Sequence, residues 1–486
     1  MSLSLARIIG NDGIVPADAA SLKVAGITSD SREVRPGDLF VAIPGGTTDG
    51  ATYISDARAR GAIAVAGLPG LIKGQGPFVE THNPRLLLAA AAARFYARQP
   101  HTIAAVTGTN GKTSVSVFVR QIWEQMGFRA ASLGTIGVIS PLGIEDATHT
   151  TPDPAHLHET LARLADNHVE HLAIEASSHG LSQYRLHGLR LTAAGFTNLT
   201  QDHLDYHQGM EDYFLAKMKL FDELLPKSGT AVINMDGSYG ESVRDRCVTN
   251  GQRVFTVGRN GKDMKLLSSH GEGFGQVISV ETASGVHKIS LPLAGDFQVS
   301  NALVAAGLVI ACGGEESLAL HALESLKGAP GRLDLVGQSQ AGAPVFVDYA
   351  HTPDALENVL RTLRPLTKNK LSVVFGCGGD RDAGKRPMMG KVAVELADRI
   401  YVTDDNPRTE DAAKIRAQIM VAAKGAMEIG SRAEAILKAT QDLKAGDVLL
   451  VAGKGHEQGQ IIGKEKRPFS DHDAVRSAIR GELYHG

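Results

Sequence analysis

Short apolar runs alternate with segments of helical periodicity, and this alternation constrains the fold more than any other feature of the sequence. The run "TIAAV" at residues 102–106 precedes a glycine-rich loop, and apolar residues then repeat at helical spacing between residues 115 and 126. The runs "HLAIE" at 171–175 and "AAGFTN" at 193–198 continue the theme. Strands that alternate with helices favour an α/β fold whose mostly parallel sheet is covered by helices.

The chain has 486 residues, which is enough for about three domains. A predicted helix begins with Asn83 as N-cap and Pro84 in its first turn, and Pro100 stops it. Gly and Pro interrupt the pattern again in "LKGAPGRLDL" at 326–335. We therefore predict three domains: a small N-terminal α/β domain, a central domain with a mostly parallel sheet, and a Rossmann-like C-terminal α/β domain, with bounds 1–100, 101–330 and 331–486.

Charge and cysteine usage exclude several classes of protein. The formal net charge of −3 gives no basic surface for nucleic acid or for an anionic membrane. The three cysteines lie far apart without metal-ligand spacing, and the sequence has neither a signal-peptide pattern nor a run of about 18 apolar residues. We expect a cytoplasmic monomer that neither binds nucleic acid nor inserts into a membrane.

The segment "TGTNGKTS" at residues 107–114 resembles a shortened phosphate-binding loop, because Val106 stands where the usual form has its first Gly. Its glycines let backbone N–H groups face phosphate oxygens, and the following helix adds its positive end. Lys112 is placed to reach the outer phosphates and Thr113 to ligate Mg²⁺. A bare Gly-Lys-Thr is also read as a plain turn before a helix, but the preceding strand and the amphipathic helix favour a nucleotide site.

A second polar group is predicted beside this loop. Glu175 ends an apolar run, and His203, Asp205 and His207 follow the next one. The carboxyl ends of parallel strands meet at one edge of a sheet, so these side chains are expected to converge around a divalent metal. A catalytic zinc site is a rival, although "HLDYH" has Leu204 where a zinc protease has its catalytic Glu. A third reading is that the histidines only form hydrogen bonds within their loop.

Nine motifs together resemble the Mur ligase family in order over almost the whole chain. They are "SDSREVRPGDLFVAIPG", "TGTNGKT", "EASSHGL", "TNLTQDHLDYH", "AKMKLF", "DYAHTPDAL", "GCGGDRDAGKRP", "TDDNPR" and "AGKGHE". This resemblance implies an ATP-dependent amide ligase of peptidoglycan precursor biosynthesis. ATP phosphorylates a carboxylate, and an amine then attacks the acyl phosphate. Three domains joined by short linkers also lead us to expect open and closed forms, because ATP on the central domain must meet an amine held by the last one.

The resemblance implies a set of catalytic and nucleotide-binding residues. One Mg²⁺ is assigned to Thr113 and Glu175, and a second to His203 and Lys217, the latter as N6-carboxylysine, a carbamate that turns a cation into an oxygen ligand. The implied catalytic residues are Lys112, Glu175, His203 and Lys217. The implied ATP-binding residues are Gly108, Thr109, Asn110, Gly111, Lys112, Thr113, Ser114, Asn301, Arg332 and Asp348.

The N-terminal domain is implied to bind the uridine of a UDP-N-acetylmuramoyl dipeptide, whose muramoyl peptide extends to the central domain. The residues implied for this substrate are Ser29, Ser31, Gly46, Thr47, Thr48, His149, Thr150, Thr151, Ser177, Gln183 and Arg185. Taken one by one, such Ser and Thr residues would be read as helix caps and loop polars.

The last domain is implied to choose the incoming amino acid. A distal carboxylate requires a bidentate Arg and a distal ammonium requires an acid, and diaminopimelate has both groups. We expect Arg381 and Arg408 to form the carboxylate clamp. The full implied set is Arg381, Asp405, Asn406, Pro407, Arg408, Gly453 and Glu457. For "DDNPR" alone, a plain turn with a solvated Arg is the alternative.

Rival functions are a lysine-adding ligase, which would lack Arg408, and folylpolyglutamate or cyanophycin synthetases, which share the loop but need neither "SDSR" nor the clamp. A dehydrogenase reading of "GCGGDRD" fails because its fingerprint requires Gly at Arg381. A nucleotide-gated binding module is the non-enzyme alternative.

Overall fold

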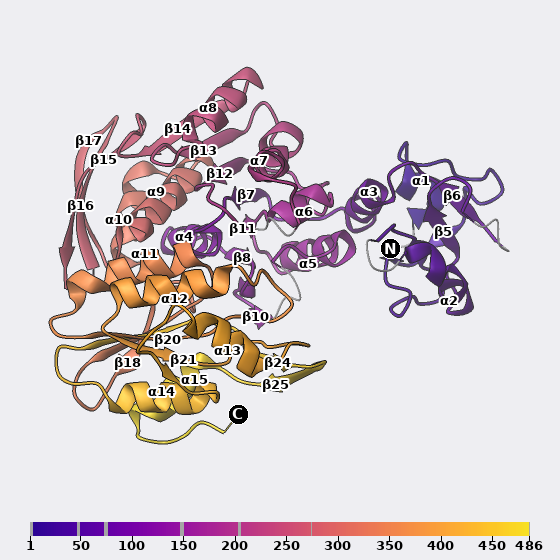
Figure 1. Cartoon of the computed structure of the whole chain (residues 1–486). Helices are drawn as coiled ribbons and strands as arrows, with labels where there is room; N and C mark the ends of the chain where they lie inside the picture. The colour runs from indigo at the N-terminus through magenta and orange to yellow at the C-terminus, as the bar shows by residue number, and fades with distance from the viewer. Residues whose placement is uncertain are drawn as a thin grey trace. The chain divides into compact units, whose positions relative to one another are not determined.

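The computed structural model describes residues 3–45, 49–71, 76–145, 150–202, 206–273 and 275–485 (Figure 1). The chain divides into two compact units. The first comprises residues 1–202, 208–262 and 304–319, and the second comprises 203–207, 263–303 and 320–486. The three predicted domain ranges are finer than this division and stay a prediction.

The first unit begins with a small parallel sheet. Its strands run in the order β3-β4-β5-β6, all parallel, and apolar side chains pack against both faces. The N-cap Asn83 accepts a hydrogen bond from the Leu86 amide, as the sequence predicts, but the helix ends at Tyr96 because Ala97 adopts a left-handed conformation. The elements are β1 (Leu3–Ser4), α1 (Leu5–Ile9), β2 (Lys23–Val24), β3 (Ile27–Thr28), β4 (Leu39–Val41), a 3₁₀ turn (Gly50–Tyr53), α2 (Ile54–Ala59), β5 (Ala64–Gly67), β6 (Phe78–Glu80) and α3 (Pro84–Tyr96).

The same unit holds the large central sheet. Strands β8-β11-β7-β12-β13-β14 are neighbours in that order and all parallel, and β9 and β10 extend the edge beyond β8 as antiparallel strands. The elements are β7 (Thr102–Thr107), α4 (Lys112–Gln125), β8 (Ala130–Gly134), β9 (Gly137–Ser140), β10 (Gly143–Glu145), α5 (Pro154–Asp166), β11 (His171–Glu175), α6 (Ser178–Ser182), β12 (Ala193–Phe196), α7 (Met210–Lys219), a π-helical turn (Leu220–Leu224), β13 (Thr230–Asn234), α8 (Gly240–Thr249) and β14 (Arg253–Gly258). Because β11, β7 and β12 are adjacent and parallel, the loops that follow them meet at one edge.

The second unit contains three successive antiparallel strands, β15 (Met264–Glu272), β16 (Gly275–Thr282) and β17 (Gly285–Leu291), which belong to the 11-stranded sheet. Helices α9 (Asp296–Ala311) and α10 (Glu316–Ala322) have residues in both units, and a 3₁₀ turn (Leu323–Ser325) follows.

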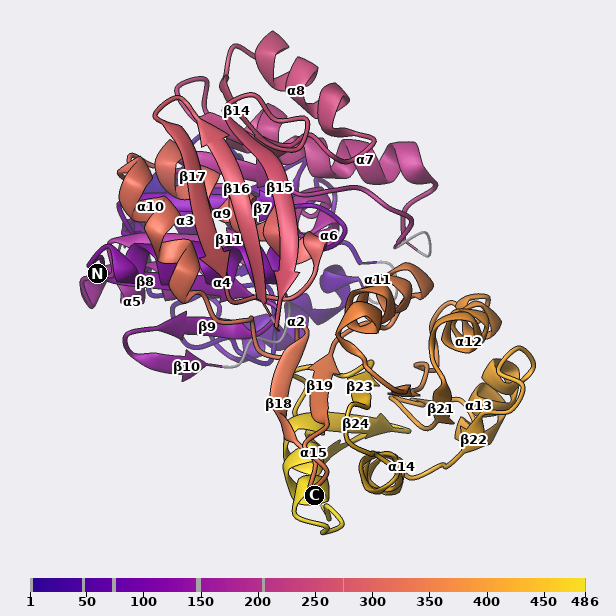
Figure 2. The same ribbon diagram turned by 90° about the vertical axis from the view of Figure 1, so that its left-hand side faces the viewer.

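The rest of the second unit is a doubly wound α/β domain. Its strands run in the order β18-β19-β23-β20-β21-β22, and every neighbouring pair is parallel except β18 with β19. Helices α11 to α13 cover one face of the sheet and α14 and α15 the other (Figure 2). The elements are β18 (Asp334–Gln338), β19 (Pro344–Asp348), α11 (Pro353–Leu363), a 3₁₀ turn (Arg364–Leu366), β20 (Leu371–Phe375), α12 (Lys385–Leu396), β21 (Arg399–Val402), α13 (Ala412–Met420), β22 (Met427–Glu428), α14 (Arg432–Gln441), β23 (Val448–Ala452), β24 (Gly459–Ile462), β25 (Glu465–Pro468) and α15 (Asp471–Ile479).

The predicted α/β class is confirmed, with a mostly parallel central sheet and a Rossmann-like C-terminal sheet. Among the described residues, no helix has the length and apolar character needed to cross a membrane.

Candidate functional site

The shortened loop lies between β7 and α4, as its pattern predicts, and its two glycines have separate structural reasons. Gly108 has φ 150°, and a Cβ atom there would come within 1.9 Å of the Thr197 hydroxyl oxygen. Gly111 has φ 89° and is the N-cap of α4, without a side chain to cap the helix. The first N–H groups of α4 therefore lack a side-chain cap at Gly111, which is the arrangement that binds an anion at a helix N-terminus.

The loop after β12 holds the phosphate loop in place. The Thr109 and Asn110 amides donate to the backbone oxygen (2.9 Å) and side-chain oxygen (3.0 Å) of Asn198, respectively. The Thr197 hydroxyl donates to the Asn110 carbonyl oxygen (2.6 Å). These two loop amides are thus engaged within the protein, and the anion-binding amides are left at the start of α4, where Ser114 is buried.

Two lysines reach this loop from different elements. Lys112 Nζ donates to the carbonyl oxygens of Gly108 and Thr109, both at 2.8 Å. Lys217 Nζ, from α7, donates to the Gly108 carbonyl oxygen at 2.7 Å and lies 4.3 Å from the centre of the Tyr213 ring. Burial, and secondly repulsion from Lys112, hold the pKa of Lys217 well below 10.5. This side chain is only 1% exposed. Both effects favour the neutral form of the amine, which is its nucleophilic form.

The carboxylate of Glu175 lies at the end of β11, buried beside the start of α4. It accepts hydrogen bonds from the hydroxyl of Thr113 (3.1 Å) and from the amide (2.8 Å) and hydroxyl (3.2 Å) of Thr135. A Cβ atom at Gly134 would lie 2.0 Å from a Glu175 carboxylate oxygen, so any larger residue there would displace this carboxylate. The structure thus brings the predicted pair Thr113 and Glu175 together. Thr135 also belongs to this group and was not predicted from the sequence. Its signal was its place directly after β8, because the other polar residues of the site also follow strands.

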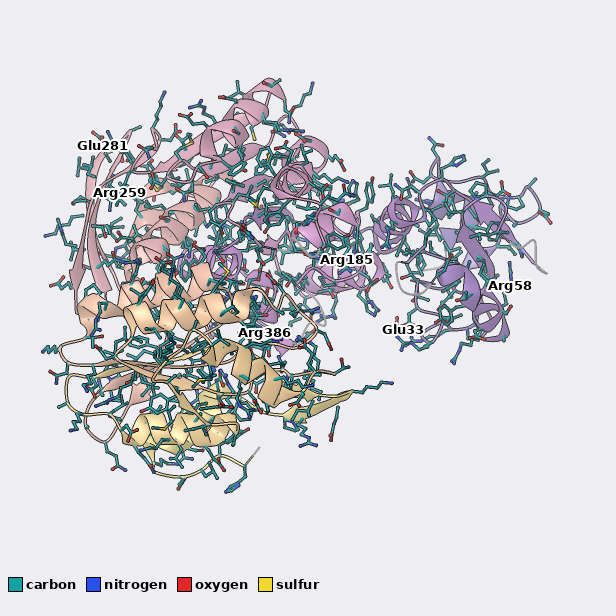
Figure 3. All side chains as sticks on the ribbon, viewed as in Figure 1. Glu33, Arg58, Arg185, Arg259, Glu281 and Arg386 are labelled. Atoms are coloured by element: carbon teal, nitrogen blue, oxygen red, sulfur yellow. The ribbon has the colours of Figure 1, made fainter. Side chains whose placement is uncertain are left out.

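A second polar group adjoins Glu175. The Thr151 hydroxyl donates to the Glu175 carbonyl oxygen (3.0 Å) and lies 3.0 Å from the Ser177 hydroxyl. Arg185 donates to the Thr151 carbonyl oxygen (2.7 Å) and to the side-chain oxygen of Gln183 (2.8 Å); it is labelled in Figure 3. The Thr150 hydroxyl lies 3.1 Å from that of Thr135. Five residues implied for one substrate are therefore gathered beside Glu175.

Several predicted site residues are not joined to these groups. Ser29 and Ser31 follow β3 in the N-terminal sheet, and within the described part of the chain neither forms a hydrogen bond to the Thr151 group. Other predicted residues lie outside the described residues: Gly46, Thr47, Thr48, His149 and His203. Asp205 lies outside the described residues as well. The described residues contain no cluster of three or more His, Cys, Asp or Glu that could hold a metal ion.

The C-terminal domain has its own polar cluster, formed after β21 and β23. Lys454 is fully buried, and its Nζ donates to the side-chain oxygen of Asn406 (3.0 Å) and to Glu457 Oε2 (2.8 Å). Asn406 Nδ2 donates to the same oxygen of Glu457 (2.9 Å). Lys454 also lies 3.6 Å from Asp405 Oδ1. Burial raises the pKa of Asp405, but Lys454 and Arg432 more than offset this, and the pKa lies below its usual value.

Arg408 follows this cluster with a left-handed backbone, φ 52°. Its Nη1 donates to the Gly379 carbonyl oxygen (2.9 Å) and to the Asn406 carbonyl oxygen (3.4 Å). Arg381 is exposed and contacts the Asp380 carbonyl oxygen. A Cβ atom at Gly378 would lie 2.8 Å from Arg408 Nη1 and 3.9 Å from Arg381 Cγ, so both arginines approach Gly378. Pro407 is buried between Asn406 and Arg408, and Gly453 has φ 122° and approaches Asp405.

The remaining predicted nucleotide residues occupy two places in the second unit. Asn301 is buried in α9, where its Nδ2 donates to the side-chain oxygen of Gln298 (3.1 Å). Asp348 ends β19, and burial raises its pKa to about 6 against the opposing effect of Arg332. The Arg332 guanidinium lies 4.6 Å from the centre of the Tyr349 ring.

Comparison with known proteins gives a match over each part of the chain. Residues 23–96 match the model described as "Mur ligase family, catalytic domain", residues 106–309 the "Mur ligase middle domain", and residues 331–455 the "Mur ligase, glutamate ligase domain".

Individual relatives match over nearly the full length. A protein of Mesorhizobium japonicum is 54% identical over 473 residues, 96% of this chain and 98% of its own, and one of Bradyrhizobium diazoefficiens is 52% identical over 485 residues, 99% of this chain and 100% of its own. Both carry the name UDP-N-acetylmuramoyl-L-alanyl-D-glutamate--2,6-diaminopimelate ligase. A solved structure of a protein of that name has a TM-score of 0.71 at 33% identity and covers 99% of both chains.

Proposed function

Because this chain belongs to the Mur ligase family, we propose that it is the ATP-dependent ligase that adds meso-2,6-diaminopimelate to UDP-N-acetylmuramoyl-L-alanyl-D-glutamate in peptidoglycan precursor synthesis. The new amide forms at the γ-carboxylate of the D-glutamate. One observation carries the choice of amine: a guanidinium, Arg408, follows directly on a carboxylate cluster that contains Glu457. The Arg408 guanidinium suits a distal carboxylate, and the Glu457 carboxylate suits an ammonium. We place this activity in the cytoplasm and in a monomer.

The phosphates of ATP are assigned to the loop between β7 and α4. The uncapped start of α4 supplies N–H groups and a positive helix end, and Lys112 supplies a charge that neutralises the outer phosphates. The loop residues Gly108 to Ser114 are assigned to this anion site. Asn301 is assigned to the adenine, and Arg332 and Asp348 to the phosphates and ribose, by their resemblance to family positions.

The donors beside the loop fit a magnesium ion. The Thr113 hydroxyl and the Glu175 carboxylate are buried oxygen donors 3.1 Å apart, and hard oxygen ligands are those that Mg²⁺ prefers. When bound, Mg²⁺ would neutralise charge on the phosphate oxygens. Glu175 would hold the ion on the sheet side, while Thr135 orients the carboxylate through its amide and hydroxyl.

Lys217 is assigned as a carbamate that helps hold a second Mg²⁺ with His203. Its burial and lowered pKa support this, because only a neutral amine attacks carbon dioxide. The carbamate places a negative charge beside the Lys112 ammonium, which attracts it.

The reaction follows from two sequential displacements. A γ-carboxylate oxygen of the dipeptide attacks the γ-phosphorus of ATP, and ADP leaves. The amine of diaminopimelate, as its free base, then attacks the acyl carbon; inorganic phosphate leaves and the nitrogen loses its extra proton. Lys112 stabilises charge on the phosphoryl oxygens, and Thr151, Ser177, Gln183 and Arg185 position the peptide carboxylate.

The UDP-sugar end of the substrate is assigned to Ser29 and Ser31, with Gly46, Thr47 and Thr48 at the diphosphate and His149 and Thr150 at the peptide. The diaminopimelate site comprises Arg381, Asp405, Asn406, Pro407, Arg408, Gly453 and Glu457. A lysine-adding ligase is the second candidate, and Arg408 argues against it because lysine has no distal carboxylate.

A stoichiometric assay tests the proposal. Purified protein is incubated with ATP, Mg²⁺ and the UDP-dipeptide, with or without diaminopimelate or lysine, and phosphate and amide product are both measured. We expect one phosphate per amide and only with diaminopimelate present. Phosphate release without either substrate would instead indicate a nucleotide-hydrolysing binding module.

A further inference from the structure

Arg386 is a buried charged side chain that contacts the loops of the proposed amino-acid site. It lies in the first turn of α12, is only 1% exposed and is labelled in Figure 3. Its Nη1 donates to Glu410 Oε2 (2.9 Å) and to the side-chain oxygen of Gln418 (2.7 Å). Its Nη2 donates to Glu410 Oε1 (2.8 Å) and to the Gly378 carbonyl oxygen (3.2 Å). One guanidinium therefore holds the loop after β20, the loop after β21 and helix α13.

Those two loops are the ones that carry the proposed clamp, since Arg381 follows β20 and Arg408 follows β21. Four further hydrogen bonds join them. Glu410 Oε1 accepts from the Asp380 amide (2.6 Å), the Asp380 carboxylate accepts from the Thr409 amide (3.1 Å) and hydroxyl (2.7 Å), and the Gly379 amide donates to the Asn406 carbonyl oxygen (2.9 Å). Several hydrogen bonds thus join the two loops, and among the described residues the buried Arg386 adds an ion pair with Glu410, whose side chain is 35% exposed.

The position of the Arg408 side chain depends on the contacts between the loops after β20 and β21, which we call the frame. Its Nη1 donates to the Gly379 carbonyl oxygen, one residue from the carbonyl oxygen that Arg386 holds. A Cβ atom at Gly379 would lie 1.9 Å from the Pro407 carbonyl oxygen, so the two loops touch without space for a side chain. A shift of the loop after β20 would therefore move Arg381, and it would also move the Gly379 carbonyl oxygen to which the Arg408 guanidinium donates.

We propose that Arg386 is a positioning residue that fixes the spacing between Arg381 and Arg408 and thereby the selectivity for an amino acid with a distal carboxylate. This inference rests on the proposed function, because it presumes that the two arginines bind that carboxylate. Arg386 acts through the two loops and does not itself touch the amino acid. A bidentate contact requires its donors in place within a fraction of an ångström, so a loosened frame weakens binding of the carboxylate first.

The test compares steady-state kinetics of Arg386→Met and Arg408→Ala with the double variant. We expect Arg386→Met to raise the KM for diaminopimelate about tenfold or more, with the KM for ATP within about twofold of wild type. In the Arg408→Ala background the same substitution should add little, because residues that act through one group are not additive. Thermal unfolding is measured alongside.

Arg399→Met is the matched control. Arg399 begins β21, at the opposite end of the strand, where its Nη1 donates to the Asp442 carbonyl oxygen (2.9 Å) and to Asp447 (3.0 Å). The substitution Arg399→Met removes a comparable ion pair from the same domain. It should lower the free energy of unfolding without a selective rise in the KM for diaminopimelate. If Arg386→Met raised the KM for ATP and for diaminopimelate equally, or behaved as Arg399→Met does, the positioning role would be overturned.

A milder variant guards against loss of folding. Thr409→Val is exposed and removes only the hydroxyl contact to Asp380. It should raise the KM for diaminopimelate about threefold with no change in the KM for ATP; an unchanged KM for diaminopimelate would overturn the inference. If Arg408→Ala raised the KM for diaminopimelate as expected while Arg386→Met and Thr409→Val left it unchanged, the positioning role of Arg386 would be rejected and the proposed function would stand. A wild-type protein that does not consume diaminopimelate would reject the proposed function instead.

Discussion

Lys217 Nζ lies 2.7 Å from the carbonyl oxygen of Gly108, the glycine that opens the phosphate loop. A buried amine is thereby fixed to the backbone that is proposed to bind ATP, and Lys112 Nζ donates to the same carbonyl oxygen at 2.8 Å. Burial, and secondly the charge of Lys112, disfavour a proton on Lys217 and hold its pKa well below 10.5. Its chemistry as a neutral amine is the basis of the first two predictions.

Lys217→Met should abolish most of the ligase activity while the protein stays folded. Met has similar length and no charge, so it fits the buried site without a desolvation cost, whereas the proposed carbamate oxygens are lost. We expect kcat to fall on the order of a hundredfold or more. Wild-type protein supplied with ¹³C-bicarbonate should show a carbamate ¹³C signal that Lys217→Met lacks; full activity of the variant would contradict the assignment.

The stability of the protein should depend on pH through Lys217. The folded protein holds the pKa of Lys217 well below 10.5, so between that lowered pKa and 10.5 the unfolded chain binds a proton that the folded chain does not. The free energy of unfolding therefore rises with pH over this window. Lys217→Met lacks this contribution, and its stability advantage over wild type should shrink as the pH rises. Denaturant unfolding in carbon-dioxide-free buffers measures this difference; parallel pH profiles would refute it.

Glu175→Gln should impair catalysis more than folding. The amide keeps an oxygen for the Thr135 amide but removes the negative charge proposed to hold Mg²⁺. We expect kcat/KM for ATP to fall about a hundredfold and the Mg²⁺ requirement to rise. Glu124→Gln, on the exposed side of α4, serves as the control. An unaltered Mg²⁺ dependence in Glu175→Gln would count against the metal assignment.

Arg408→Ala should weaken diaminopimelate selectively. Loss of a charge-assisted bidentate contact should raise the KM for diaminopimelate on the order of a hundredfold, with the KM for ATP unchanged. Discrimination against lysine should fall by the same factor. Arg381→Ala should have a smaller effect, since Arg381 is exposed and its donor lies 3.4 Å from the Asp380 carbonyl oxygen. Equal rises in both KM values for Arg408→Ala would contradict the clamp.

Strand order accounts for much of what the sequence predicts. The rule that polar residues after parallel strands converge brings Thr113 and Glu175 together, and the same rule applies to Asn406 and Glu457. Local capping chemistry likewise predicts the start of α3 at Asn83. These features depend on short-range pattern and on the geometry common to parallel sheets.

Other features depend on tertiary packing that the pattern does not contain. Strands β15 to β17 were not predicted, although buried positions alternate along most of β16. The sequence offers Lys217 and Lys219 two positions apart on a helix, and spacing alone does not show that Lys217 is buried while Lys219 lies over the Tyr184 ring. The burial of Arg386 is equally hidden, because arginine is usually exposed and its partner Glu410 lies 24 residues away.

Isotope transfer from the dipeptide most directly tests the claim that ATP phosphorylates the γ-carboxylate of the dipeptide. The γ-carboxylate of the UDP-dipeptide is labelled with ¹⁸O, and the phosphate released with ATP and diaminopimelate is analysed by mass spectrometry. Attack of the carboxylate on the γ-phosphorus predicts one ¹⁸O atom in each phosphate released, in step with amide formation. Unlabelled phosphate would show that water, and not the dipeptide, receives the phosphoryl group, and would contradict the proposed ligase mechanism.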